Sequence, residues 1–406
     1  MSRREGGATP RCVHFGECGG CSLQHIPYPE QLRLKRELVT RLVRAAVSDA
    51  PAARPTLAGT PIDNPWGYRQ KIHFVFGSDR SGRRLVMGHY ARGTRRVIPV
   101  RECPVHDERG NTLAFALRDE FMQAGVASAP EGTMKSVVIR AGQHTPELVA
   151  TLVVTAASDT RVRAATRRVL DSPGPASPSS LHVNVHPRGD AFIFGRETRR
   201  ISGTERLRED VAGISFLISP TSFFQTNVRA AEILVLLVRA AIPAGARVLD
   251  LYAGTGLFAL RLARDGCTVV AVEENRDAVA DGEASRRLNR IPAAKCRFIA
   301  RSAEDAIRAL RRPPRGRSEP FDVVVLDPTR EGCSPPVIEE TFGVLSPGTA
   351  VYVSCNPETL ARDLGAITTH RYRIESLQPV DMFPHTDHIE TVAVLRRGSG
   401  SELLRR

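Results

Sequence analysis

The chain has 406 residues, 42% of them hydrophobic and 25% charged, which suits two or three domains with buried cores. No apolar run approaches the ~18 residues of a membrane-spanning helix and no secretory signal is visible, so we expect a cytoplasmic protein outside the membrane. The 57 Lys and Arg residues exceed the 44 Asp and Glu residues by 13. This surplus suits a polyanionic partner, but a chain with many arginines and four lysines is equally consistent with codon bias.

The N-terminal segment concentrates three of the eight cysteines, Cys12, Cys18 and Cys21, among glycines. A reducing compartment disfavours disulfides, and clustered thiols in such a chain are typical of metal ligands. Residues 1–28 are therefore predicted to form a loop around a small inorganic centre, with the metal supplying its fold.

The next two segments differ in their periodicity. Residues 29–54 carry apolar residues at helical spacing from Leu32 to Val47, which predicts one amphipathic helix that packs on the C-terminal domain. Residues 55–205 contain short β-branched runs bounded by Gly, Pro or Asp. The runs are YRQKIHFVFG, RLVMGHY, KSVVIRAG, ELVATLVVTA, LHVNVHP and AFIFG. They predict a β-rich (α+β) central domain.

Residues 206–406 alternate strands with helical segments, as in ARVLDLY, LFALRLARDG and CTVVAVEEN. This alternation predicts a parallel sheet with crossover helices, an α/β domain of the Rossmann-like class. The runs FDVVVLDP and AVYVSCNP add two buried strands, and each ends in polar residues.

A glycine-rich turn with Gly254 and Gly256 follows the first of these strands, and Glu273 ends the next one. The glycines allow a ligand to approach the backbone, and the carboxylate is placed to accept from ribose hydroxyls. A nicotinamide dinucleotide is one alternative, but GxGxxG is not matched. S-adenosylmethionine (SAM), which has no pyrophosphate, is favoured.

Asp327 and Cys355 each follow a predicted strand. Because the carboxyl ends of parallel strands face the ligand crevice, both side chains are expected to converge on the glycine-rich turn. Cys355 precedes Asn356-Pro357, a turn that presents a thiol rather than burying it.

Glu390 precedes the final strand, where a glutamate is ordinarily a solvated edge residue. The loop before it carries three residues that resemble metal ligands, but without a further ligand we interpret it as a solvated loop. These residues are His385, Asp387 and His388.

Five motifs, in this order, resemble those of the RNA uracil-C5 methyltransferase family, which uses SAM to make 5-methyluridine. They are FFQTN (223–227), DLYAGTGLF (250–258), LDPTREG (326–332), SCNPETLARDL (354–364) and DMFPHTDHIE (381–390), and the resemblance extends from Cys12 to Leu395. It implies that Cys355 is the nucleophile and Glu390 the general base. The cofactor and target-base site that it implies consists of Gln225, Tyr252, Gly254, Gly256, Leu257, Glu273 and Asp327.

The chain departs from the family in three places. Leu257 occupies a position where members commonly have Asn, and Ser302 occupies a position where some members have Asn. Many members carry a small RNA-binding β-barrel before the cysteines, and with eleven residues before Cys12 we expect that barrel to be absent.

The resemblance also implies that Cys12, Cys18, Cys21 and Cys103 hold a [4Fe-4S] cluster with a structural or RNA-organising role. From the residue types alone, four thiolates fit either zinc or an iron–sulfur centre. The first spacing, five residues between Cys12 and Cys18, differs from the CxxxCxxC of radical-SAM enzymes.

The chemistry of uracil explains why a thiol and a carboxylate are required. C5 is too weak a nucleophile to attack a methyl sulfonium, but addition of a thiolate at C6 makes C5 an enolate carbon. A carboxylate must then remove the C5 proton. The target base must leave its stack, so RNA is the partner of the surplus positive charge.

The sequence therefore predicts a monomeric, cytoplasmic, SAM-dependent RNA uracil-C5 methyltransferase, with 23S rRNA as the preferred substrate. The alternatives are methylation of tRNA and, in another class, a metal-stabilised RNA-binding protein without catalysis. The joint presence of Cys355, Glu390, Asp327 and Gln225 favours the enzyme.

Overall fold

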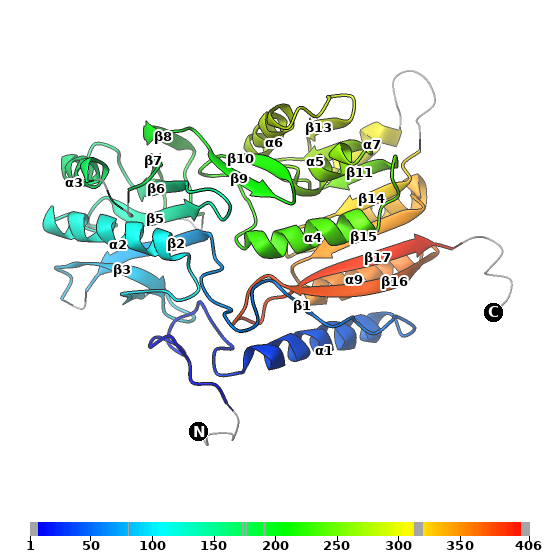
Figure 1. Cartoon of the computed structure of the whole chain (residues 1–406), viewed down its shortest axis with the longest axis horizontal. Helices are drawn as coiled ribbons and strands as arrows, with labels where there is room; N and C mark the ends of the chain where they lie inside the picture. The colour runs from blue at the N-terminus through cyan, green and yellow to red at the C-terminus, as the bar shows by residue number, and fades with distance from the viewer. Residues whose placement is uncertain are drawn as a thin grey trace. The chain divides into compact units, whose positions relative to one another are not determined.

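The computed structural model describes residues 7–79, 81–172, 174, 177–189, 192–311 and 320–398 (Figure 1). The chain divides into two compact units. Unit 1 comprises Met1–Pro27, Asp63–Asp210 and Leu217–Val228, and unit 2 comprises Tyr28–Ile62, Val211–Phe216 and Arg229–Arg406. None of the helices within the described residues is long and apolar enough to cross a membrane.

Unit 1 is built on a seven-stranded sheet with the order β4-β3-β2-β5-β6-β7-β8. All neighbours in it are antiparallel except β6 and β7, which are parallel. The strands are β2 (Lys71–Ser78), β3 (Leu85–Tyr90), β4 (Val97–Pro99), β5 (Met134–Ala141), β6 (Leu148–Val154), β7 (Ser180–Val185) and β8 (Glu197–Gly203).

Two helices pack on this sheet, α2 (Glu108–Gln123) and α3 (Thr160–Asp171). Both begin at an aspartate whose side chain accepts backbone N–H groups of the first turn, Asp107 and Asp159. Their apolar faces share one core with the strands, through residues such as Leu117, Val162 and Ile139. The sequence analysis identified neither helix, although the α+β class allows both.

One predicted strand in this unit is wrong. Phe192–Gly195 of the AFIFG run do not form a strand, and the strand in this region, β8, begins at Glu197. Ala191 lies outside the described residues. Asn184 of β7 donates to the Gly195 carbonyl at 3.0 Å and accepts its N–H at 2.7 Å. A Cβ at Gly195 would lie 2.0 Å from the Val185 carbonyl oxygen, so this close approach requires glycine.

Unit 2 contains an eight-stranded sheet with the order β1-β16-β17-β15-β14-β11-β12-β13. The strands are β1 (Leu57–Ala58), β11 (Arg247–Leu251), β12 (Thr268–Glu273), β13 (Cys296–Ala300), β14 (Val323–Leu326), β15 (Thr349–Ser354), β16 (Tyr372–Asp381) and β17 (Glu390–Arg397). Neighbours are parallel except for β17, which runs antiparallel to both β15 and β16. A separate two-stranded sheet, β9 (Leu207–Val211) and β10 (Ile214–Ile218), comes before β11 in the chain.

Helices cover the large sheet. They are α1 (Tyr28–Ala46), α4 (Val228–Ala240), α5 (Leu257–Arg264), α6 (Arg276–Leu288), α7 (Ala303–Arg311), α8 (Pro335–Ile338), a π-helical turn (Glu339–Leu345) and α9 (Pro357–Thr368). Val39 and Val43 of α1 are fully buried in one core with Leu364 of α9. This architecture confirms the predicted α/β, Rossmann-like class.

The order of the strands creates a switch point at β11. From β11 the chain proceeds to β12 and β13 on one side of the sheet and to β14 and β15 on the other. Leu251, the last residue of β11, is in register with Val272 and Leu326, and Leu326 is in register with Tyr352. The carboxyl ends of these strands therefore share one edge, where ligands of open α/β sheets bind.

Candidate active site and candidate metal centre

The turn after β11 has an unusual backbone. Tyr252 (φ 64°), Gly254 (φ 55°) and Gly256 (φ 86°) all have positive φ, which is uncommon for a residue with a side chain such as Tyr252. A Cβ at Gly256 would lie 2.6 Å from Cζ of Phe298, so the packing also requires glycine there. The side chain of Leu257, the first residue of α5, is buried, so only its backbone N–H is available to a ligand at this helix end.

Glu273 connects the end of β12 to this turn. Its Oε2 accepts the Gly254 N–H at 2.9 Å, and its Oε1 accepts the Asn275 N–H at 2.8 Å. Because each carboxylate oxygen has a second lone pair, Glu273 can still accept hydrogen bonds from a ligand.

Two aspartates lie at the switch point, Asp250 in β11, which is buried, and Asp327 after β14, which is half-buried. Burial raises the pKa of Asp327 to about 7. Burial and the charge of Asp327 raise the pKa of Asp250 well above its usual range. Burial therefore favours the protonated, neutral form of both side chains, and a nearby cation would lower both pKa values. The sequence analysis predicted Asp327 but not Asp250, although Asp250 begins the DLYAGTGLF motif.

Cys355 and Glu390 come together because β15 and β17 are antiparallel. The ladder ends at the pair Ser354–Thr391, and Cys355 and Glu390 are the next residues beyond that pair on their two strands. Burial, followed by the charges of Glu390 and Asp327, raises the pKa of the Cys355 thiol to about 11. Burial and Asp327 raise the pKa of Glu390 well above its usual range. The predicted nucleophile and base thus lie within electrostatic reach of each other.

Arg330 supplies the opposing charge, and the sequence analysis did not single it out. Its guanidinium lowers the pKa of both Cys355 and Glu390. The Arg330 carbonyl accepts from Asn356 Nδ2 at 3.0 Å and from Thr359 Oγ1 at 3.1 Å, which fixes this loop against the start of α9. Asn356 is also the N-cap of α9, so Cys355 immediately precedes a helix N-terminus, a position that favours a thiolate.

The loop that leads to Glu390 is held by α1. Gln31 Oε1 accepts the His385 N–H at 2.8 Å, and the Gln31 side chain also bonds the His385 ring at 3.2 Å. His385 is only 4% exposed, so the prediction of a solvated loop is wrong at this position, whereas Asp387 is exposed. No local sequence pattern predicts the burial of His385, because its partner, Gln31, lies on a helix 354 residues earlier in the chain.

Comparisons with known proteins show the family of this chain. The model of the tRNA (uracil-5-)-methyltransferase family matches residues 185–398. A protein of Gloeobacter violaceus described as an uncharacterised RNA methyltransferase is 35% identical over 393 residues, covering 95% of this chain and 82% of the relative. The chain belongs to the tRNA (uracil-5-)-methyltransferase family. It is an RNA (uracil-5-)-methyltransferase that uses SAM, as the sequence predicted.

Two further proteins are similar to this chain over nearly its whole length. A Halalkalibacterium halodurans protein described as an uncharacterised RNA methyltransferase is 33% identical over 401 residues, covering 95% of this chain and 82% of the relative. The crystal structure of Pyrococcus abyssi tRNA (uracil-54, C5)-methyltransferase in complex with S-adenosyl-L-homocysteine superposes with a TM-score of 0.74. It is 27% identical to this methyltransferase, covering 94% of this chain and 86% of the neighbour.

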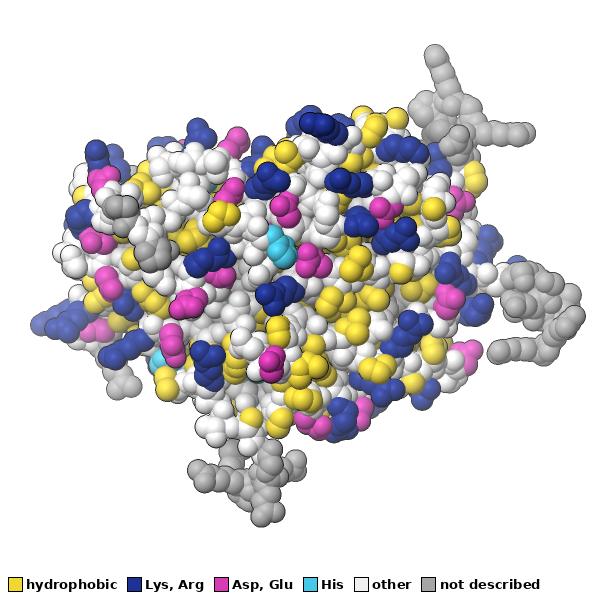
Figure 2. Space-filling view, in the orientation of Figure 1, with side chains coloured by type: hydrophobic (Ala, Val, Ile, Leu, Met, Phe, Trp, Pro, Cys, Tyr) yellow, Lys and Arg dark blue, Asp and Glu magenta, His cyan; other side chains and the backbone are white. Residues whose placement is uncertain are grey.

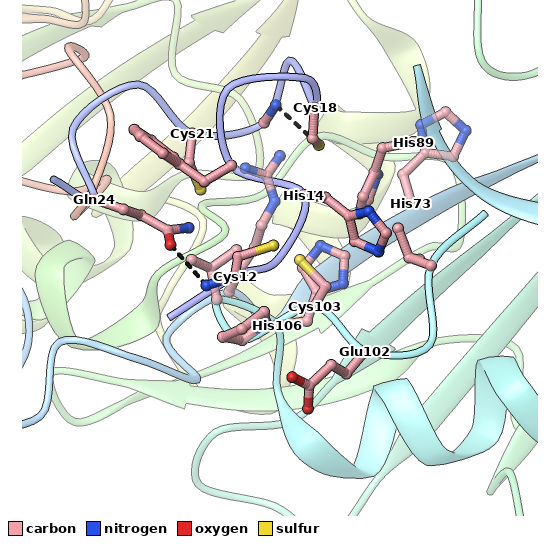
Figure 3. A pocket seen from close by; sticks show the side chains of 16 residues that line it. Cys12, His14, Cys18, Cys21, Gln24, His73, His89, Glu102, Cys103 and His106 are labelled. Carbon is pink, nitrogen blue, oxygen red and sulfur yellow. Dashed lines mark hydrogen bonds between the residues drawn. The ribbon is translucent and has the colours of Figure 1, made fainter. Parts of the chain in front are cut away.

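Two groups of predicted residues of this methyltransferase belong to unit 1. Gln225 lies in its segment Leu217–Val228 and is half-buried, next to the exposed Phe223. The other group is the four predicted metal ligands, which line one cavity of about 220 Å³ (Figure 3). These are Cys12, Cys18, Cys21 and Cys103.

The N-terminal cysteine loop is attached to the sheet of unit 1 at this cavity. Cys18 forms a β-bridge with Ala91, and the Gly19 N–H donates to the Tyr90 carbonyl at 3.2 Å. The Gln24 side chain accepts the Cys12 N–H at 3.1 Å, which closes the loop on itself. Backbone pairing, rather than side-chain packing, therefore orients the thiols.

The thiols affect one another electrostatically. Burial and then the charge of Cys21 raise the pKa of Cys103 to about 12, with further contributions from Cys12 and Cys18. Burial also raises the pKa of Cys18 and Cys21. Four convergent thiols of this kind fit an iron–sulfur cluster, because each iron of a [4Fe-4S] centre takes one thiolate and metal binding offsets the cost of deprotonation.

Histidines share the cavity, and the sequence analysis did not predict them. His14, His73, His89 and His106 line it together with Arg69. Burial lowers the pKa of His73 and of His89 to about 4, and that of His106 well below its usual range. These three rings are therefore neutral at pH 7. Their separation in the sequence left no local signal for a shared site.

Proposed function

We propose that this RNA uracil-C5 methyltransferase acts through a covalent adduct of Cys355 with C6 of the target uracil, with Glu390 as the general base. This proposal rests on two observations: Cys355 and Glu390 are the next residues beyond the pair Ser354–Thr391 that ends the β15–β17 ladder, and the charge of Glu390 raises the pKa of the Cys355 thiol. A nucleophile and a base on adjacent strands reach neighbouring ring atoms, such as C6 and C5, from fixed backbone positions.

The proposed reaction balances in four steps. The Cys355 thiolate adds to C6, and the C5=C6 electron pair becomes an enolate. C5 then takes the methyl group from SAM, which is a substrate, and the neutral thioether S-adenosylhomocysteine leaves. The Glu390 carboxylate accepts the C5 proton. The electron pair of the C5–H bond re-forms C5=C6 as the C6–S bond breaks, which restores the thiolate.

The electrostatics of the site favour binding of SAM before the thiol ionises. Without a ligand, burial and then the charges of Glu390 and Asp327 raise the pKa of Cys355 to about 11, and the thiol stays protonated at neutral pH. A sulfonium cation beside these carboxylates would lower the pKa of Cys355 and of Glu390, in the same direction as Arg330. The nucleophile would then be generated only when the methyl donor is present.

We also propose that Cys12, Cys18, Cys21 and Cys103 hold a [4Fe-4S] cluster. Their common cavity and their mutual charge effects support this proposal. When bound, the cluster would supply a covalent cross-link between the N-terminal loop and the segment that follows β4.

For the RNA substrate we propose 23S rRNA, acted on in the cytoplasm. Transfer RNA is the second candidate, because the Pyrococcus abyssi neighbour is a tRNA (uracil-54, C5)-methyltransferase. Arg92 and Arg95 are exposed beside the half-exposed ring of Tyr90 and line a common groove, which suits phosphate contacts and base stacking. Figure 2 shows basic side chains interspersed with acidic and apolar ones over the visible face.

The deciding experiment maps 5-methyluridine in 23S rRNA and in tRNA from cells with and without the gene, and repeats the assay with purified protein and each RNA. Loss of one 5-methyluridine from 23S rRNA, restored by wild-type protein but not by Cys355→Ala, is the expected result. Loss confined to tRNA would reject the rRNA substrate and leave the mechanism intact. Methylation by Cys355→Ala would reject the mechanism.

A further inference from the structure

Three potential ligands for a single metal ion lie together in unit 1, and only one of them belongs to the predicted cluster set. One donor atom from each of His89, Cys103 and His106 lies within 4.8 Å of the others. Tetrahedral zinc with bonds of about 2.0–2.3 Å separates its donor atoms by about 3.5 Å. Side-chain rotations that move the donor atoms by about 1 Å would therefore complete the geometry.

The fold brings these three side chains together in two ways. Cys103 and His106 belong to one tight turn, in which the His106 N–H donates to the Cys103 carbonyl at 3.0 Å. His89 lies on β3, where it pairs with Ile98 of β4, the strand that leads into that turn. The ring centroids of His89 and His106 are 5.3 Å apart and nearly perpendicular. The arrangement is therefore set by backbone pairing on both sides.

The His89 imidazole also has an unused ring nitrogen. Nε2 of His89 is buried and has no hydrogen-bond partner within the part of the chain that the structure describes, whereas the His106 ring interacts with the Asn111 side chain. Buried polar atoms are normally satisfied, so an unpaired ring nitrogen beside a thiol indicates a missing partner. One nitrogen of each ring and the Cys103 sulfur are the donor atoms available to a metal ion.

We propose that His89, Cys103 and His106 form a mixed nitrogen and sulfur site for Zn²⁺, with a water as the fourth ligand. Two imidazoles, one thiolate and an open position are a donor set that zinc prefers. Because Cys103 cannot serve both centres, zinc occupies this site only in protein that lacks the iron–sulfur cluster. This site does not depend on the proposed methyl transfer.

The first test is a Co²⁺ titration of the full-length protein after removal of bound metal with a chelator. We expect one equivalent to bind with the absorption of a tetrahedral site and a sulfur-to-cobalt charge-transfer band. His89→Ala and His106→Ala should each weaken Co²⁺ binding by roughly tenfold or more. His73→Ala is the matched control, since His73 lines the same cavity outside the trio and should bind Co²⁺ like wild type.

The second control separates this site from the four cysteines. Cys12→Ser should leave Co²⁺ binding intact but abolish the iron–sulfur cluster, whereas wild-type protein that carries its full iron content should take up no Co²⁺. Wild-type affinity in both His89→Ala and His106→Ala would overturn the proposal.

X-ray absorption of the zinc-loaded wild-type protein provides a test that needs no variant and is therefore insensitive to misfolding. One sulfur and two imidazole nitrogens around zinc are expected. A shell of four sulfurs would overturn the proposal and assign zinc to the cysteines alone. Methylation assays with Cys355→Ala report separately on the proposed function.

Discussion

Lys35 Nζ of α1 lies 2.6 Å from Oδ1 of Asp381, and both side chains are buried, with 2% and 0% exposure. Lys35 also donates to the Phe383 carbonyl at 3.1 Å, and Asp381 accepts the Phe383 N–H at 3.1 Å. This ion pair attaches α1 to the end of β16, where the loop toward Glu390 begins. An N-terminal helix thus holds the loop that leads to a proposed catalytic residue.

Breaking this pair should destabilise the protein. Lys35→Met leaves the Asp381 carboxylate buried without its cation, which typically costs about 3–5 kcal/mol. Urea unfolding should show this loss in the free energy of unfolding. Arg33→Met on the same helix is the control, because Arg33 pairs with Glu30 and Glu37 while 52% exposed. Exposed pairs contribute about 0–1 kcal/mol, so equal effects of the two variants would contradict the structural role of Lys35.

The two proposed catalytic residues should differ in the covalent species that they allow. Cys355→Ala should abolish methylation and form no adduct, because addition at C6 cannot occur. Glu390→Gln should permit addition and methyl transfer but stall before elimination, so a denaturation-resistant complex with methylated RNA accumulates. RNA containing 5-fluorouridine should trap the wild-type enzyme likewise. Denaturing gels report the shifted band, and a band that persists in Cys355→Ala would identify another nucleophile.

The reactivity of Cys355 should depend on pH with opposite shifts in two variants. In the unliganded protein, alkylation of Cys355 should accelerate as pH rises toward its pKa of about 11. Asp327→Asn removes a negative charge that raises this pKa, so its profile should move to lower pH. Arg330→Met removes a positive charge that lowers it, so its profile should move to higher pH. Brief alkylation at a series of pH values, with the extent at Cys355 quantified by peptide mass spectrometry, measures both profiles. Shifts of the two variants in the same direction would exclude this electrostatic account.

The cysteine cavity should hold iron in protein purified without oxygen. We expect a brown protein with about four irons per chain, and loss of the colour in Cys18→Ser and Cys21→Ser. Cys267→Ser is the control, because Cys267 is buried in unit 2 and should not affect the iron content. Iron analysis and visible absorption measure the outcome. A colourless anaerobic protein with stoichiometric zinc would reject the cluster.

RNA binding should weaken steeply with salt if arginines contact phosphates. Removal of one phosphate contact, as in Arg95→Ala, should reduce the slope of log K against log salt by about one. Arg167→Ala is a control of equal charge on the exposed face of α3, where Arg167 pairs with Asp171. Filter binding over a salt series measures both slopes, and equal slopes in all three proteins would show that Arg95 does not contact RNA.

The sequence alone predicted the class of unit 2 and the strand ends on which the proposed site residues lie. Strand runs, the glycine-rich turn and the polar residues after each strand are local signals, and the carboxyl ends of parallel strands necessarily share an edge. This is why Glu273, Asp327 and Cys355 could be predicted to converge without any knowledge of long-range contacts.

The tertiary structure decided what depends on partners distant in the chain. Lys35 and Asp381 are 346 residues apart, so neither periodicity nor spacing relates them. For the same reason, the sequence did not predict that Arg330 is the cation near Cys355 or that His89 lies close to Cys103. His385 appeared solvated because polar loops are usually exposed, but Gln31 satisfies its ring inside the protein. Burial and pairing of polar groups follow from packing between segments, and local sequence carries little of that information.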